Sequence, residues 1–114
     1  MDPRLEPGAI VVAHLVRPTE KYWGLLHSID TAGVALRAIN LSSFDDWMRS
    51  AIYGEEIGLG LATIFFPLHR VERIFLDEPV GMVESMAQTF ERRVGKSVQD
   101  FLDQSEGRVD ETAN

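Results

Sequence analysis

Apolar and β-branched residues occur in short runs separated by turn residues in the first part of the chain. Pro7-Gly8 precedes a run over residues 9–17, and further runs cover residues 22–30 and 34–41. Short runs of this composition between turn residues are typical of β-strands. The connections of about four residues have the length of hairpin loops. The pattern therefore predicts an antiparallel meander of three strands.

The spacing of apolar positions changes after residue 41. One face of a helix is predicted by the series Phe44, Trp47, Met48, Ala51 and Ile52, because these residues recur at the three- and four-residue intervals of an α-helix. Gly54 follows the last of them and ends the pattern. We expect a helix inserted at about residues 43–53, packed through this stripe against the sheet or presenting it to a partner.

Strand composition returns over residues 63–77, a run too long for one straight strand. Pro67 cannot donate a hydrogen bond to a neighbouring strand, so it favours a break. We expect a fourth strand from Thr63 to Phe66 and a fifth from Val71 to Leu76.

A second helical stripe follows Pro79, a residue that suits the first turn of a helix. It consists of Val83, Met86, Ala87, Phe90 and Val94, and Ser97 then resembles the cap of a shorter helix. The predicted organisation is a bent five-stranded β-barrel over residues 1–78, a helical extension over residues 79–104 and a flexible tail over residues 105–114. The fold class is mainly β with helices.

Charge and composition restrict the function. The chain of 114 residues has 11 basic and 18 acidic residues, a net charge of −7, and no cysteine. Such a charge disfavours broad nucleic-acid binding, and the lack of thiols excludes disulfides, thiolate zinc sites and cysteine nucleophiles. No stretch reaches the ~18 apolar residues that a membrane span needs, and the N-terminus does not resemble a signal peptide. We expect a cytoplasmic protein without a cofactor.

Two segments resemble the Sm-like superfamily, which includes the LSm proteins and the bacterial RNA chaperone Hfq. Gly24, Leu26, Ile29 and Asp30 form the pattern Gly-x-Leu-x-x-Ile-Asp, which is similar to the first signature of that family. The segment His69-Arg70-Val71-Glu72-Arg73-Ile74 is similar to the stretch where Hfq-type proteins carry a histidine ahead of the last strand. The resemblance covers about residues 8–76.

The resemblance implies a small Sm-like barrel that assembles into rings of six or seven copies and binds short single-stranded RNA. A barrel of this type exposes the edges of its fourth and fifth strands. We expect these edges to form an oligomer interface through Phe65, Phe66, Ile74 and Phe75, because exposed apolar edges tend to pair. His69 and Arg70, at the predicted strand break, are the candidate contacts to RNA or another ligand.

Two other functions fit the same residues. The acidic surface and the helices favour a protein–protein interaction or regulatory scaffold that does not bind nucleic acid. The second alternative is a small metal- or ligand-binding protein. In that case His14 and His27 would lie on one face of a hairpin, and His69 would be a third zinc ligand. No catalytic motif of the hydrolase, phosphate-loop or metalloprotease type occurs. We therefore expect a binding module and not an enzyme.

Overall fold

The computed structural model describes residues 4–54 and 60–103. The chain divides into two compact units, Met1–Asp77 and Glu78–Asn114. This division falls one residue before the end of the predicted barrel. The predicted tail at residues 105–114 lies outside the described residues.

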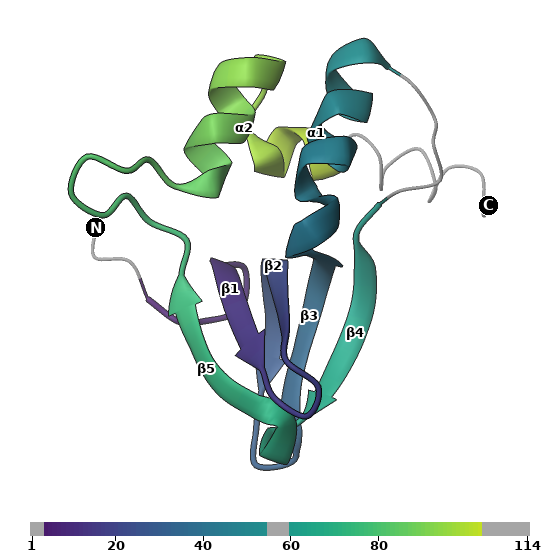
Figure 1. Ribbon diagram of the computed structural model, residues 1–114, viewed down its shortest axis with the longest axis vertical. Coiled ribbons are helices and arrows are strands. Elements are labelled where there is room, and N and C mark those ends of the chain that lie inside the picture. Colours follow the sequence, from purple (N-terminus) through teal and green to yellow (C-terminus); the bar gives the residue numbers. More distant parts are fainter. Residues whose placement is uncertain (1–3, 55–59, 104–114) are drawn as a thin grey trace. The chain divides into compact units, whose positions relative to one another are not determined.

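The first unit contains one antiparallel sheet of five strands (Figure 1). The strands are β1 (Ile10–Leu15), β2 (Glu20–Ile29), β3 (Gly33–Asn40), β4 (Ala62–Pro67) and β5 (Val71–Leu76). Their spatial order is β4-β3-β2-β1-β5. All five predicted strands are present, and the expected break at Pro67 is the short 3-10 turn η2 (Leu68–Arg70).

The sheet is open, whereas the sequence predicted a barrel. β4 and β5 end the strand order on opposite sides and do not pair with each other. Figure 1 shows them joined only through η2 and curving away along either side of the three central strands. The three residues of η2 reverse the chain, but β5 then pairs with β1 and leaves the outer edge of β4 free. Both edges of the sheet therefore lack a partner strand among the described residues.

Gly24 allows β2 to cross close to its neighbour β3. A Cβ atom at this position would lie 2.6 Å from the Cα of Ala38 and would overlap the carbonyl oxygen of Arg37. Nearby, the register between β2 and β3 shifts at His27, which forms a bulge. Bulges increase the local bend and twist of a strand, so the glycine and the bulge together account for the curvature that the sequence pattern predicted.

The two faces of the sheet have different environments. The inner face encloses the main core, which consists of Val11, Ala13, Leu15, Leu26, Val34, Leu36, Ala38 and Phe66. Residues that alternate with these along the strands, such as Val12, Trp23 and Ile39, lie on the outer face and are also buried. A core of this kind provides most of the favourable free energy of folding.

The inserted helix covers part of the outer face. The turn η1 (Leu41–Ser43) leads into α1 (Phe44–Tyr53), which ends at Gly54 in the left-handed conformation. Trp23 on β2 contacts Phe44 and Trp47 at ring-centroid distances of 4.9 and 5.6 Å. The predicted apolar stripe is therefore a packing surface, and only Ile52 at its end is exposed.

The second unit begins with a tight turn, not with the helix predicted from Pro79. Val80 and Val83 exchange two backbone hydrogen bonds around Gly81, which has a φ of 59°. The helix α2 (Met86–Val94) starts later, because Ser85 caps it in a reciprocal capping box with Gln88. Residues 98–103 are helical again. None of the described helices is long and apolar enough to cross a membrane.

Candidate functional site

The two residues predicted to contact a ligand lie in η2, but their environments differ. His69 is exposed, and its carbonyl oxygen accepts a hydrogen bond of 2.7 Å from the guanidinium of Arg17. This bond uses the backbone of His69 and leaves its imidazole exposed at the end of the sheet where β4 turns into β5.

Arg70 is held by the β1–β2 hairpin. Its Nε donates to the carbonyl of Val16 at 3.1 Å, and its Nη2 donates to the carbonyl of Pro18 at 2.9 Å. The same Nη2 lies 2.8 Å from the Glu20 carboxylate. A guanidinium presents its donors in a fixed fork, and here that fork fastens η2 to the hairpin. The side chain therefore has a structural role, and a ligand that recruited it would have to break these bonds.

The four residues predicted to form an oligomer interface are divided between the core and the surface. Phe66 is buried in the inner core, and Ile74 packs against it. Phe65 and Phe75 are 54% and 42% exposed. Side-chain contacts to a partner can therefore come from Phe65 and Phe75, while Phe66 and Ile74 contribute only the backbone of their edge strands.

The three histidines do not form a metal site. His14 pairs with Lys21 across the β1–β2 ladder, and His27 lies six residues further along β2, a separation of about 20 Å at the rise of a strand. His14 and His27 are therefore too far apart along the hairpin to bind one metal ion. No cluster of three or more metal-ligating side chains occurs within residues 4–54 and 60–103.

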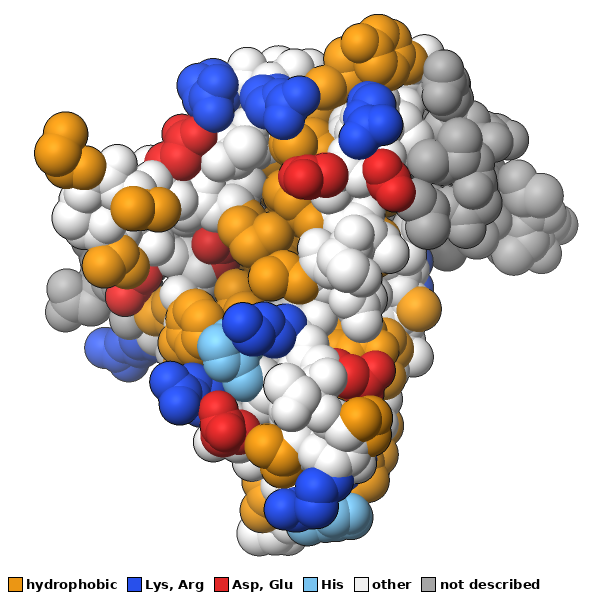
Figure 2. All heavy atoms as spheres, in the orientation of Figure 1, with side chains coloured by type: hydrophobic (Ala, Val, Ile, Leu, Met, Phe, Trp, Pro, Cys, Tyr) orange, Lys and Arg blue, Asp and Glu red, His pale blue; other side chains and the backbone are white. Residues whose placement is uncertain are grey.

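A row of two cationic side chains with a histidine between them crosses three strands, and the sequence pattern does not reveal it. His14 on β1 lies directly opposite Lys21 on β2 and directly opposite Arg73 on β5. Directly opposite residues share a face of the sheet, with Cβ atoms ~5 Å apart. All three therefore lie on the outer face, and Figure 2 shows basic side chains gathered around a histidine. Only the pairing register could have revealed this row, because its members are far apart in sequence.

The imidazole of His14 is partly buried and sits against an aromatic ring. Phe75 packs edge-to-face with it at a centroid distance of 5.0 Å. Burial lowers the pKa of His14 below its usual value, and the charges of Lys21 and Arg73 lower that pKa further, against a smaller opposing effect of Glu72. Burial and the two flanking cations therefore both favour the neutral imidazole.

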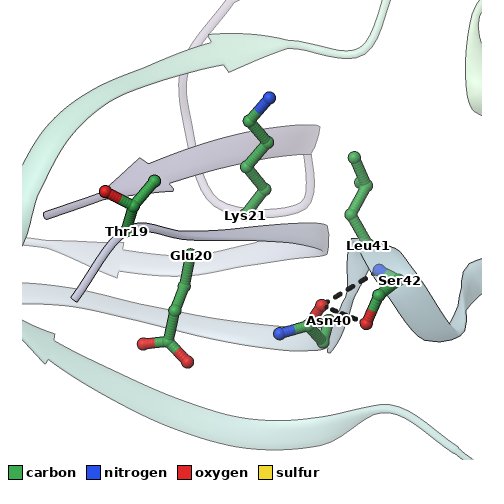
Figure 3. Close-up of a pocket in the computed structure, with 6 residues that line it drawn as sticks. All are labelled: Thr19, Glu20, Lys21, Asn40, Leu41 and Ser42. Atoms are coloured by element: carbon green, nitrogen blue, oxygen red, sulfur yellow. Dashed lines mark hydrogen bonds between the residues drawn. The ribbon is translucent and has the colours of Figure 1, made fainter.

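An open hollow of about 440 Å³ adjoins this row and shares Lys21 with it. Its lining residues are Thr19, Glu20, Lys21, Asn40, Leu41 and Ser42. Figure 3 shows Lys21 and Leu41 extending on one side of β2, while Glu20 points to the other side. Asn40 Oδ1 accepts hydrogen bonds from the backbone N–H and the hydroxyl of Ser42, at 2.9 and 2.8 Å. These bonds hold the start of η1 in place beside the hollow.

An exposed apolar turn is the most prominent surface feature of the second unit. Val80 and Val83 are each 71% exposed, and Met82 between them is fully exposed. The apolar spacing predicts a helix for this segment, because Val83 continues the helical spacing of α2. The backbone bonds between Val80 and Val83 instead present the three side chains on a closed turn.

Comparisons with known proteins identify no relative. No family description matches the chain, and no curated protein or solved structure is significantly similar to it.

Proposed function

We propose that this chain is a non-catalytic, Sm-like module that assembles with copies of itself through the edges of its sheet and binds a partner. The observation that carries the proposal is the pair of edge strands, β4 and β5, at opposite ends of one curved sheet, each with no outer partner strand within residues 4–54 and 60–103 (Figure 1). An unpaired edge exposes a row of backbone donors and acceptors, which is a template for pairing with another strand.

The two edges are matched in length. β4 and β5 have six residues each, so each edge offers about 20 Å of backbone. Phe65 on β4 lies opposite Ala35, and Phe75 on β5 lies opposite Val12. Both phenyl rings are thus on the outer face, where they can add apolar contacts beside a new strand pair without displacing the core.

Pairing of β4 in one copy with β5 in the next is heterologous, because two different surfaces meet. Such contacts close into a ring when the rotation between copies allows it, and otherwise continue as a filament. The closed ring of six or seven copies is what the Sm-like resemblance implies. The matched free edges support assembly of this type in the present chain.

The partner is the second part of the proposal. Short single-stranded RNA is implied by the resemblance through His69, which is exposed. The intramolecular bonds of Arg70 and the net charge of −7 favour a protein partner instead. An electrophoretic shift assay with an oligo-U probe at low salt separates the two. Binding that is lost in His69→Ala supports RNA, and no shift with the wild type supports a protein partner.

Assembly is tested with one lysine substitution on each edge. We expect the wild type to be oligomeric at micromolar concentration by light scattering coupled to size exclusion. Phe65→Lys and Phe75→Lys should each reduce it to a monomer, because a charged side chain opposes edge pairing. Ile29→Lys is the matched control, since Ile29 is 50% exposed but lies on the internal strand β2.

Mixing the two variants distinguishes head-to-tail pairing from symmetric pairing. Phe65→Lys keeps an intact β5 edge, and Phe75→Lys keeps an intact β4 edge. Their mixture should form a dimer and no larger species, since only one productive interface remains. A wild type that is monomeric at micromolar concentration, or variants that remain oligomeric, would contradict the proposed assembly.

A further inference from the structure

We infer that the outer face of β5, β1 and β2 carries a binding site for a small multivalent oxyanion, formed by Arg73, His14 and Lys21. The site lies within a single copy of the chain and does not depend on assembly. Pairing at a sheet edge takes place in the plane of the sheet, so it leaves this face accessible.

The register of the sheet brings the three side chains together. His14 is opposite Lys21 on one side and opposite Arg73 on the other. With strands ~4.8 Å apart, the row is about 10 Å wide, and the long side chains of Lys21 and Arg73 can both reach an anion above His14. An oxyanion with two charged groups can contact both cations at once.

The charge balance of the row is positive, in contrast to the acidic chain as a whole. The carboxylate of Glu72 raises the pKa of His14. Its Oε1 lies 3.3 Å from Nη2 of Arg73. Both members of this pair are largely exposed, with side-chain exposures of 64% for Arg73 and 47% for Glu72. An exposed ion pair of this kind is weak and readily exchanged for another anion. Lys21 has no ion pair among those found within the described residues.

The surroundings of the row suit the organic part of a ligand. Phe75 provides a half-exposed aromatic surface on one side and holds the His14 ring by edge-to-face packing. On the other side, the hollow next to Lys21 has a volume of about 440 Å³ and offers hydroxyl and amide groups. This volume lies in the range of small-molecule sites. Glu20, the one carboxylate in its lining, is paired with Arg70.

The interaction of the cations with His14 predicts a coupling between anion binding and protonation. A bound anion neutralises Lys21 and Arg73 and stabilises the imidazolium, so it should raise the pKa of His14. By linkage, the affinity for the anion should increase as the pH falls through the titration range of His14. Glu72 also acts on the row: its charge raises the pKa of His14, whereas the charges of Lys21 and Arg73 lower it.

The test follows the His14 imidazole by NMR during titration with inorganic pyrophosphate at low salt. We expect saturable shifts of the His14 resonances and a higher pKa of His14 when pyrophosphate is bound. Lys21→Gln and Arg73→Gln should each weaken binding by roughly tenfold, a typical loss for one charged contact. His14→Gln should weaken binding most below the titration range of His14, because it removes the imidazolium, and it should abolish the part of the pH dependence that follows this titration. Arg49→Gln, which changes an exposed arginine on α1, is the matched control and should bind as the wild type does.

Parallel titrations with citrate and oligo-U identify the source of the anion. Tighter binding of pyrophosphate than of citrate indicates a phosphate ligand, and the reverse indicates a carboxylate ligand. Oligo-U that shifts His14 in preference to both indicates nucleic-acid phosphate. The monomeric Phe65→Lys variant should bind pyrophosphate as the wild type does, which separates this inference from the assembly proposal. The inference would be overturned by the absence of His14 shifts at millimolar pyrophosphate, or by Lys21→Gln and Arg73→Gln variants that bind pyrophosphate as tightly as the wild type.

Discussion

The guanidinium of Arg70 lies 2.8 Å from the carboxylate of Glu20, with both side chains largely shielded from solvent. The pair joins η2 to the start of β2 across 50 residues of sequence. Together with the two bonds from Arg70 to backbone carbonyls, it ties the β4–β5 connection to the β1–β2 hairpin.

Arg70→Lys should lower the free energy of unfolding by about 2 kcal/mol. A lysine cannot reproduce the fork that donates to Val16, Pro18 and Glu20, and it leaves partly buried acceptors without a partner. Chemical denaturation monitored by tryptophan fluorescence measures the change. The control is Arg49→Lys, whose pair with Asp46 is exposed and should change stability by less than ~0.5 kcal/mol. Equal effects of the two substitutions would contradict the structural role of Arg70.

Gly24→Ala should destabilise the sheet by about 3 kcal/mol or more. The added methyl group would overlap the backbone of β3, and strands in a packed sheet cannot separate without losing hydrogen bonds. Gly60→Ala is the matched control, because a Cβ there meets no atom within 4 Å. Circular dichroism during thermal unfolding should show a large fall in melting temperature for Gly24→Ala only. A mild effect would show that β2 and β3 are less closely spaced than described.

Phe44→Ala should cost about 3 kcal/mol, because it removes a buried ring that contacts Trp23 and leaves a cavity between α1 and the sheet. Tyr53→Ala on the same helix is the control, since Tyr53 is 68% exposed. Denaturation and the fluorescence of the two tryptophans report the change. Similar stabilities for both variants would mean that α1 does not pack on the outer face.

Folding stability should depend on pH through His14. Its pKa is lowered in the folded state, so the unfolded chain binds the proton more readily between that lowered value and about 6.5. The His14 contribution is fully present above pH ~6.5 and is lost as the pH falls through this window. His14→Gln should flatten the stability profile there. His27→Gln, which changes an exposed histidine on β2, is the control.

Ser85→Ala should destabilise α2 by about 1 kcal/mol. The hydroxyl of Ser85 accepts a hydrogen bond from the Gln88 backbone, and the Gln88 side chain accepts one from the backbone N–H of Ser85. Ser85→Thr keeps the hydroxyl and should be close to the wild type. Amide exchange in residues 86–94 measures the loss. Unchanged protection in Ser85→Ala would show that the capping box does not set the start of the helix.

The strands and helices of the first unit were predictable because their signals are local. Alternation of apolar residues, turn residues and the break at Pro67 each operate over a few positions, and they located all five strands and α1. The start of α2 was not predicted. Helical spacing extends back to Val83, but the cap at Ser85 and the turn at Gly81 end the helix there. The start of this helix is therefore set by its capping residues and not by the spacing of its apolar residues.

The surroundings of the candidate site residues could not be predicted from the sequence. His69 and Phe65 are exposed, whereas Phe66 is buried and Arg70 is held by the hairpin. A side chain near a strand break can point to solvent or bind another loop. For Arg70 the outcome depends on the β1–β2 hairpin, whose residues are more than 50 positions away in the sequence.

From the amino-acid pattern alone, the five strands in their sequence order and the inserted helix could be inferred, because each depends on neighbours a few residues away. The tertiary structure alone decided the register that aligns Lys21, His14 and Arg73, the open edges of β4 and β5, and the fastening role of Arg70. These features arise from pairing between segments that are far apart in the sequence, such as β1 and β5, and pairing of that range is set by the packing of the whole sheet.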